Sequence, residues 1–285
     1  MIKSAYNPIR RNRNVGTAKQ GHGRTNTMTL PSVCNCERTW WENLGPHIVL
    51  EQRAGSHKIT FIVEQTRKGC VHACSVDDVC QLLSHVPASD LEALDTMVMR
   101  QSTRKQELVN PAWGRLAYSA NIGRPGKKTI RSGPAVFLEA KDPTEVWKWA
   151  QNLRPEEALE LNRLRSDGHR VEDTGKHFVF HSNSESIRAT QLYRTLLHEL
   201  GHWVDWLERV VRPAREDSAL YEVLSDRYFS RPHLEREAFA HQYADRLREH
   251  LKAKGQIPFE KLSRGPAQRD KILNPAQKSK IRSQF

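Results

Sequence analysis

Hydrophobic positions recur every three or four residues between Ala189 and Val210. Leu197, Leu200, Val204 and Leu207 set this spacing, and the segment contains no proline and one glycine. This periodicity predicts an amphipathic helix that buries one side and leaves polar residues on the other.

A second helix is predicted after Pro232. Phe239, Tyr243 and Leu247 repeat at intervals of four residues, and Ser230 precedes them as a candidate N-cap. Proline is tolerated in the first turn of a helix, so its position agrees with a helix start.

The preceding part of the chain mixes strand-like and helix-like segments. The β-branched stretches His47–Arg53 and Lys58–Thr66 flank a short turn and predict a hairpin. Ser75, followed by acidic residues, predicts a helix through Leu83. We also expect helices over Ala88–Arg100 and Thr144–Leu164, and strands over Leu116–Tyr118, Ala135–Ala140 and His177–His181. The predicted fold class is therefore α+β.

The net charge of +12 is concentrated at the two ends of the chain. Residues 1–36 carry six Lys/Arg and no acid, and residues 250–285 carry nine against two acids, which leaves 30 bases and 31 acids between them. We interpret 1–37 and 251–285 as flexible basic arms around one folded domain, 38–250. Within it, 38–174 is an accessory N-terminal part and 175–250 is the metal-binding part. The arms could attract nucleic acid or an acidic protein through weak, salt-sensitive contacts, or only keep the chain soluble.

The sequence has no apolar run of about 18 residues, and its first thirty residues lack the apolar stretch of a secretory signal. We therefore expect no membrane contact and a cytoplasmic location.

Five cysteines, at positions 34, 36, 70, 74 and 80, lie in the first third of the chain. Their number is odd, and the spacings of Cys34-x-Cys36 and Cys70-x-x-x-Cys74 differ from the paired CxxC of a zinc ribbon. A cytosolic location disfavours disulfides. Cys80 is expected to be a buried small hydrophobic residue.

The first predicted helix carries the sequence His198-Glu199-Leu-Gly-His202. Two histidines four residues apart project from the same side of a helix, which is a zinc-binding geometry. Zinc held there leaves a coordination position for water, and Glu199 can take a proton from that water as it attacks a carbonyl. The motif predicts hydrolysis, with a peptide bond as the expected substrate. The alternative is a charged helix whose histidines pair with carboxylates.

A catalytic zinc usually has three protein ligands, so another is expected elsewhere in the chain. Glu208 would need a sharp turn inside an unbroken helical pattern, and we reject it. The second helix offers Glu237 and Glu235. Glu237 is preferred because it shares its side with the small residues Ala240 and Ala244, which permit close approach to the first helix, and Glu235 remains the alternative.

His-Glu-Leu-Gly-His-Trp-Val-Asp followed by Glu-Ala-Phe-Ala-His-Gln-Tyr resembles the glutamate-liganded zincins, and within them the catalytic domain of anthrax lethal factor and its relatives. The resemblance covers residues 175–250. It implies a zincin-like domain with a small mixed sheet, a catalytic helix and a second, ligand-bearing helix. It also implies Zn²⁺ ligands at His198, His202 and Glu237, with Glu199 as the general base.

The resemblance assigns further roles around the metal. Asp205, one helical turn past His202, would accept the imidazole N–H that faces away from the metal. Tyr228 would donate a hydrogen bond to the oxyanion, a part that His233, His241 or Arg231 could also play. The strand His177–His181 would align an extended substrate, unless its phenylalanines face the core.

Taken together, these patterns predict a zinc metallopeptidase, an endopeptidase acting on polypeptides. The alternative is a DNA-associated protein of antirestriction or mobile-element type, in which the zincin-like domain is structural or regulatory and the basic arms carry the activity.

Overall fold

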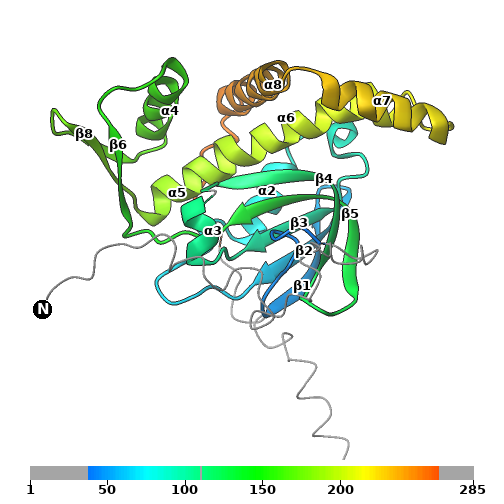
Figure 1. Cartoon of the computed structure of the whole chain (residues 1–285), viewed down its shortest axis with the longest axis horizontal. Coiled ribbons are helices and arrows are strands. Elements are labelled where there is room, and N and C mark those ends of the chain that lie inside the picture. Colours follow the sequence, from blue (N-terminus) through cyan, green and yellow to red (C-terminus); the bar gives the residue numbers. More distant parts are fainter. Residues whose placement is uncertain (1–37, 110, 263–285) are drawn as a thin grey trace, which may run out of the picture. The chain divides into compact units, whose positions relative to one another are not determined.

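The computed structural model describes residues 38–109 and 111–262. Helices and strands follow one another in mixed order, which confirms the α+β class (Figure 1). None of the described helices is long and apolar enough to cross a membrane. The N-terminal arm, Cys34, Cys36 and residues 263–285 of the C-terminal arm lie outside the described residues.

A five-stranded sheet forms the centre of the fold, with the order β1-β2-β3-β5-β4. Its strands are β1 (His47–Ala54), β2 (His57–Glu64), β3 (Thr96–Arg100), β4 (Gly114–Gly123) and β5 (Thr129–Glu139). The β1–β2 pair is the predicted hairpin. Strands β2, β3 and β5 run parallel, whereas β4 is antiparallel to β5 and lies at one edge of the sheet.

A smaller antiparallel sheet has the order β6-β8-β7. Its strands are β6 (Val146–Ala150), β7 (Arg170–Asp173) and β8 (His177–His181). The α-helices are α2 (Val76–Leu83), α3 (Arg104–Val109), α4 (Pro155–Ser166), α5 (Ser184–Thr190), α6 (Leu196–Trp206), α7 (Ser218–Ser230) and α8 (His233–Ala253). The helix predicted after Ser75 is α2, and a capping box begins it, because the Ser75 hydroxyl and the Asp78 carboxylate each accept a backbone N–H of the other residue.

The helix predicted over Ala189–Val210 is confirmed and forms most of one continuous helical segment. This segment begins with α5 and passes through the π-helical stretch η3 (Gln191–Thr195), α6 and the π-helical stretch η4 (Leu207–Val211). It crosses one face of the large sheet, α8 lies on its other side, and α7 extends from its far end (Figure 1). The leucines of α6 are completely buried, as the periodicity requires.

The expected helix over Ala88–Arg100 is wrong. Residues Ala88–Leu91 form one 3₁₀ turn, Ala93 adopts φ 59°, and Thr96–Arg100 is the central strand β3 with every residue buried. A short strand that is buried on both faces has no regular alternation of polar and apolar positions, so periodicity does not distinguish a strand from a helix there.

The expected helix over Thr144–Leu164 is correct only in its second half. Residues Val146–Ala150 form β6, in which Trp147 and Trp149 are half-buried and their neighbours are exposed. Both indoles contact the ring of Phe180, at centroid distances of 5.2 and 4.6 Å. This alternation is that of a strand with one covered face, and the helix starts at Pro155.

The substrate-aligning role expected for His177–His181 is also wrong. This strand is β8, which lies between β6 and β7 and pairs with both of them. A strand that pairs on both sides has no free backbone N–H and C=O groups with which to bind an extended peptide. Phe180 is completely buried, so the alternative that these aromatic residues face a core is supported.

The folded part continues beyond the expected boundary at residue 250. Helix α8 runs to Ala253, and Ile257 is buried. The Arg188 guanidinium donates to the carbonyl of Phe259 and forms a buried ion pair with Asp78, N···O 2.8 Å, while Asp78 also accepts the N–H of Leu262. Residues 251–262 therefore belong to the domain.

Three cysteines lie in the described part of the chain and form no disulfide there. Cys70 and Cys74 are buried and Cys80 is half-buried, and burial raises the pKa of the Cys74 thiol to about 12. A thiol with so high a pKa is a poor nucleophile at neutral pH.

We expect His169 to make the protein less stable in mild acid. Its buried imidazole bonds to the hydroxyls of Ser182 and Thr190, and desolvation lowers its pKa from 6.5 to about 4. Below pH 6.5 the unfolded chain binds a proton at this site before the folded chain does. Stability is therefore lost as the pH falls from 6.5 towards 4, by about 3 kcal/mol for such a difference in pKa.

Urea unfolding at pH 7 and pH 4.5 measures this effect. The His169→Gln variant keeps a polar side chain without the titration, and its loss of stability between the two pH values should be clearly smaller than that of the wild type. Equal losses in the two proteins would contradict the assignment.

Candidate metal centre

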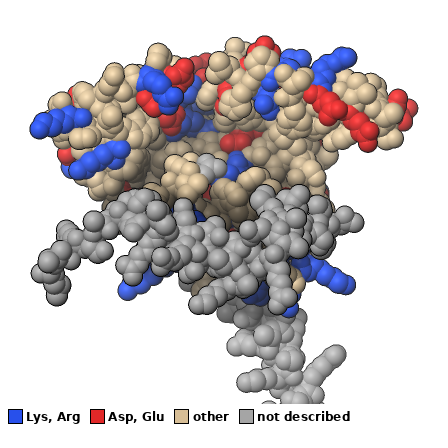
Figure 2. Space-filling model, in the orientation of Figure 1, with Lys and Arg blue, Asp and Glu red and all other residues tan. Residues whose placement is uncertain are grey.

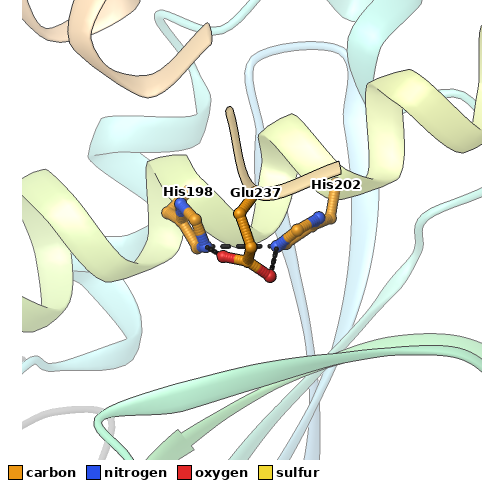
Figure 3. A group of neighbouring side chains, drawn as sticks. All are labelled: His198, His202 and Glu237. Carbon is orange, nitrogen blue, oxygen red and sulfur yellow. Dashed lines mark hydrogen bonds and ion pairs between the residues drawn. The ribbon is translucent and has the colours of Figure 1, made fainter. Parts of the chain in front are cut away.

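Three side chains from two helices meet at one point. His198 and His202 project from α6, and Glu237 reaches between them from α8 (Figure 3). The two Nε2 atoms lie 3.1 Å apart, and each lies 3.3 Å from a different carboxylate oxygen of Glu237. This is the arrangement predicted for the two histidines and the preferred third ligand.

The three side chains are close enough together to bind one metal ion. Zinc bonds imidazole nitrogen and carboxylate oxygen at about 2.0–2.2 Å, which places two ligand atoms of a tetrahedral site about 3.3–3.5 Å apart. The two imidazole nitrogens, 3.1 Å apart, are close to this separation. Each of them is 3.3 Å from its own oxygen of Glu237, and one ligand atom from each of the three residues lies within 4.8 Å of the other two. The side chains are 16%, 13% and 29% exposed, so the group is mostly covered yet open on one side. It is a donor set that could hold a divalent metal.

Electrostatics favour the charged form of Glu237. Burial would raise the pKa of its carboxyl, but hydrogen bonds with His198 and His202 outweigh burial and hold the pKa well below its usual range. His233, exposed on the first turn of α8, brings Nε2 to 3.2 Å from the same carboxylate. Glu237 is therefore ionised at neutral pH, as a metal ligand must be.

His241 also lies beside this group. Its ring centroid is 4.4 Å from that of His198, and burial, followed by the charge of His198, lowers its pKa to about 4. A neutral imidazole packs there without repelling a bound cation.

The close approach of α6 and α8 depends on Gly201. A Cβ atom at this position would lie 2.7 Å from the carbonyl oxygen of Ala240 and 2.8 Å from its Cα. Glycine inside a helix costs stability relative to alanine, so its presence is explained by this backbone contact. Ala240, which we expected to permit close approach because it is small, is the residue of α8 that Gly201 contacts.

We expect Gly201→Ala to weaken metal binding. The added methyl group overlaps backbone atoms of α8, and the overlap is relieved only if α8 moves away with Glu237. Overpacking of this kind costs about 1–3 kcal/mol of stability. Titration with zinc against a competing chelator measures the affinity, and Glu208→Ala at an exposed position of the same helical segment is the control. Unchanged affinity in Gly201→Ala would show that the contact does not set the geometry of the site.

Glu199 is held against the edge strand of the large sheet. Its Oε2 accepts the backbone N–H of Leu116 in β4 at 2.7 Å. Burial raises the pKa of its carboxyl, although the two neighbouring imidazoles and the Leu116 N–H oppose this. A carboxylate with a raised pKa is a better proton acceptor near neutral pH. Sequence reasoning did not find the Leu116 contact, because pairing partners 83 positions apart leave no local signal.

The two other glutamates considered as ligands lie away from this group. Glu208 is exposed on η4. The side chain of Glu235 is 58% exposed and lies 3.6 Å from Nε of Arg231. Among the described residues the metal-ligand group contains neither of them.

The expected contact between Asp205 and His202 is not formed. The Asp205 carboxylate is fully buried and bonds to Arg209 and Arg231 instead. Nδ1 of His202 and Nδ1 of His198 have no hydrogen-bond partner among the described residues. Helical spacing places the aspartate near the histidine, but the arginines provide a stronger, charged partner.

Tyr228 lies in the core rather than at an exposed part of the site. It is 1% exposed, and its hydroxyl is 3.1 Å from that of Tyr118 in β4. Burial is the largest of the causes that raise its pKa far above the usual value. Its proposed role as oxyanion donor remains a prediction. Tyr118 is half-buried on the same strand as Leu116, and nothing in the local sequence indicates its place beside Tyr228.

The surface is hollowed below the helices, and acidic and basic side chains are visible in this hollow (Figure 2).

Comparison of the chain with protein-family models, with curated proteins and with solved structures finds no match.

Proposed function

We propose that the protein is a zinc-dependent metallopeptidase. The observation that carries this proposal is the meeting of His198, His202 and Glu237 in one group that could hold a metal ion, with a half-buried carboxylate, Glu199, on the same helix as the two histidines. Three protein ligands leave one position free, which distinguishes a catalytic zinc site from a structural one.

The donor set supports zinc in particular. Two imidazoles and one carboxylate form a known class of catalytic zinc site. When bound, zinc would supply an acidified water and polarise the carbonyl of the substrate. His198, His202 and Glu237 would hold the ion.

Glu199 would serve as the general base. It follows His198 directly in the sequence, and the Leu116 N–H fixes one of its carboxylate oxygens, which leaves the other free to accept a proton. After the attack on the carbonyl, the same carboxyl would pass that proton to the leaving amine. The raised pKa of Glu199 assists the first step, in which the carboxylate accepts the proton of the water.

Strand β4 would align the substrate in place of β8. It is the edge strand beside α6, and its Leu116 N–H points away from β5 towards Glu199. Extended peptides commonly add to such an edge through backbone hydrogen bonds. The proposal thus places the scissile bond between β4 and the metal ligands.

Hydrolysis of an unstructured peptide library tests the proposal. The zinc-loaded protein should cleave peptides, a chelator should abolish cleavage, and added zinc should restore it. Cleavage that continues unchanged in the chelator, or fails to appear in the zinc-loaded protein, would contradict the proposal.

A further inference from the structure

We propose that Asp205 and Arg231 position the third ligand, Glu237, by tying the start of α8 to α6. This inference rests on the metal site proposed above. It gives Asp205 a role different from the histidine contact that the sequence suggested.

Asp205 lies one helical turn after His202 and is completely buried. One of its oxygens, Oδ2, accepts from a terminal nitrogen of Arg231 at 2.8 Å, and Oδ1 accepts from Nε of Arg209 at 2.5 Å. A buried carboxylate needs such partners, because an unpaired buried charge is strongly destabilising. The two arginines, however, connect the aspartate to different parts of the chain.

Arg231 is located at the turn between α7 and α8. It is the C-cap residue of α7 with extended backbone angles, φ −65° and ψ 147°, and Pro232 follows it. Its guanidinium also lies over the ring of Tyr228, 5.5 Å from the centroid, and its side chain is only 19% exposed. Arg231 is thus a well-packed group that joins the turn to α6.

The first turn of α8 has no side-chain cap of its own. Pro232 occupies the N-cap position and makes no side-chain hydrogen bond to the helix. Uncapped helix ends fray, because their first N–H groups lack partners. The ion pair from Arg231 to Asp205 is therefore a fixed attachment immediately before the helix begins.

Glu237 lies between two attachments of α8 to α6. The first is the ion pair of Arg231 with Asp205, and the second is the backbone contact of Ala240 with Gly201. Glu237 lies six positions after Arg231 and three positions before Ala240. Removal of the first attachment frees the turn that precedes the ligand, while the second still holds the rest of the helix.

Arg209 provides a matched comparison. It bonds to the same carboxylate, but it belongs to the same helical segment as Asp205, four residues later, and its side chain is 51% exposed. Its ion pair therefore connects no separate elements. Loss of Arg209 removes one charge partner of Asp205 and leaves the attachment of α8 intact.

Zinc affinity and unfolding of the metal-free protein, measured on the full chain, test the proposal. We expect Arg231→Gln to weaken zinc binding about 10–100-fold, the effect usual for residues that orient metal ligands. Arg209→Gln should stay within about twofold of the wild type, as expected for a partly exposed ion pair. Arg231→Lys keeps the positive charge but lacks the planar guanidinium group, so its zinc affinity should lie between those of the wild type and Arg231→Gln.

Unfolding separates positioning from general stability. If Arg231→Gln and Arg209→Gln destabilise the metal-free protein alike but only the former loses zinc affinity, the positioning role is supported. Equal zinc affinity in wild type, Arg231→Gln and Arg231→Lys would overturn it, as would an equal loss in Arg209→Gln. If Arg231→Gln does not fold, the affinity of Arg231→Lys decides between these results.

The two proposals fail in different ways. A wild type that binds no zinc would overturn the proposed function and this inference together. A wild type that binds zinc, with Arg231 variants that bind it equally well, would overturn this inference alone.

Discussion

Glu199→Gln is expected to abolish hydrolysis and leave the metal in place. The amide has the shape of the carboxylate, and its oxygen can still accept the N–H of Leu116, so the local structure should persist. It cannot accept a proton from the attacking water, and loss of a positioned general base typically lowers the rate by about 10²–10⁴-fold. Peptide cleavage, measured together with zinc content, separates the two effects.

Glu208→Gln is the control for this substitution. Glu208 is exposed further along the same helical segment, so the variant makes the same chemical change away from the candidate metal centre and should keep full activity. Activity of Glu199→Gln close to that of the wild type would rule out Glu199 as the base. Loss of zinc together with activity would instead give Glu199 a role in holding the metal.

Glu237→Ala should have the largest effect on metal binding. It removes one of three ligands and leaves only the two imidazoles of α6. Residues that merely orient ligands change affinity by about 10–100-fold, so we expect loss of the ligand itself to exceed about 100-fold. A titration against a chelator of known affinity measures the change.

Glu235→Ala is the matched control, because it deletes a carboxylate two residues away on the same helix. Its exposed side chain contacts Arg231 rather than the histidines, and zinc affinity should remain near that of the wild type. The reverse result, with affinity lost in Glu235→Ala and kept in Glu237→Ala, would make Glu235 the ligand. The first turn of α8 would then have to point Glu235, and not Glu237, at the two histidines.

The metal-ligand group could be predicted from the sequence because local spacing determines most of it. The four-residue interval places His198 and His202 on one side of α6, and the small residue Ala240 indicated which side of α8 approaches that helix. These are properties of single helices, and helical periodicity is the strongest local signal in a sequence.

The parts of the site that depend on pairing between distant segments could not be predicted. The contact of Leu116 with Glu199 requires the edge position of β4, and the sequence contains no record of strand order. The expected substrate strand was assigned to β8 for the same reason. Alternating aromatic residues mark a strand but not whether it has one neighbour or two.

The hydrogen-bond partner of Asp205 was predicted wrongly. Spacing along a helix shows which side chains are near one another, but it does not show which of them form hydrogen bonds. Asp205 is one turn from His202, yet two arginines, one of them 26 residues away, take its carboxylate. Burial of a charge makes a cationic partner more favourable than a neutral imidazole.

Metal analysis of the purified protein is the direct test of whether His198, His202 and Glu237 bind zinc. Wild type, His198→Ala and Glu237→Ala would be prepared in identical buffers without added zinc and analysed by mass spectrometry. We expect near-stoichiometric zinc in the wild type and its loss in both variants. Wild type without metal, or zinc retained by both variants, would contradict it.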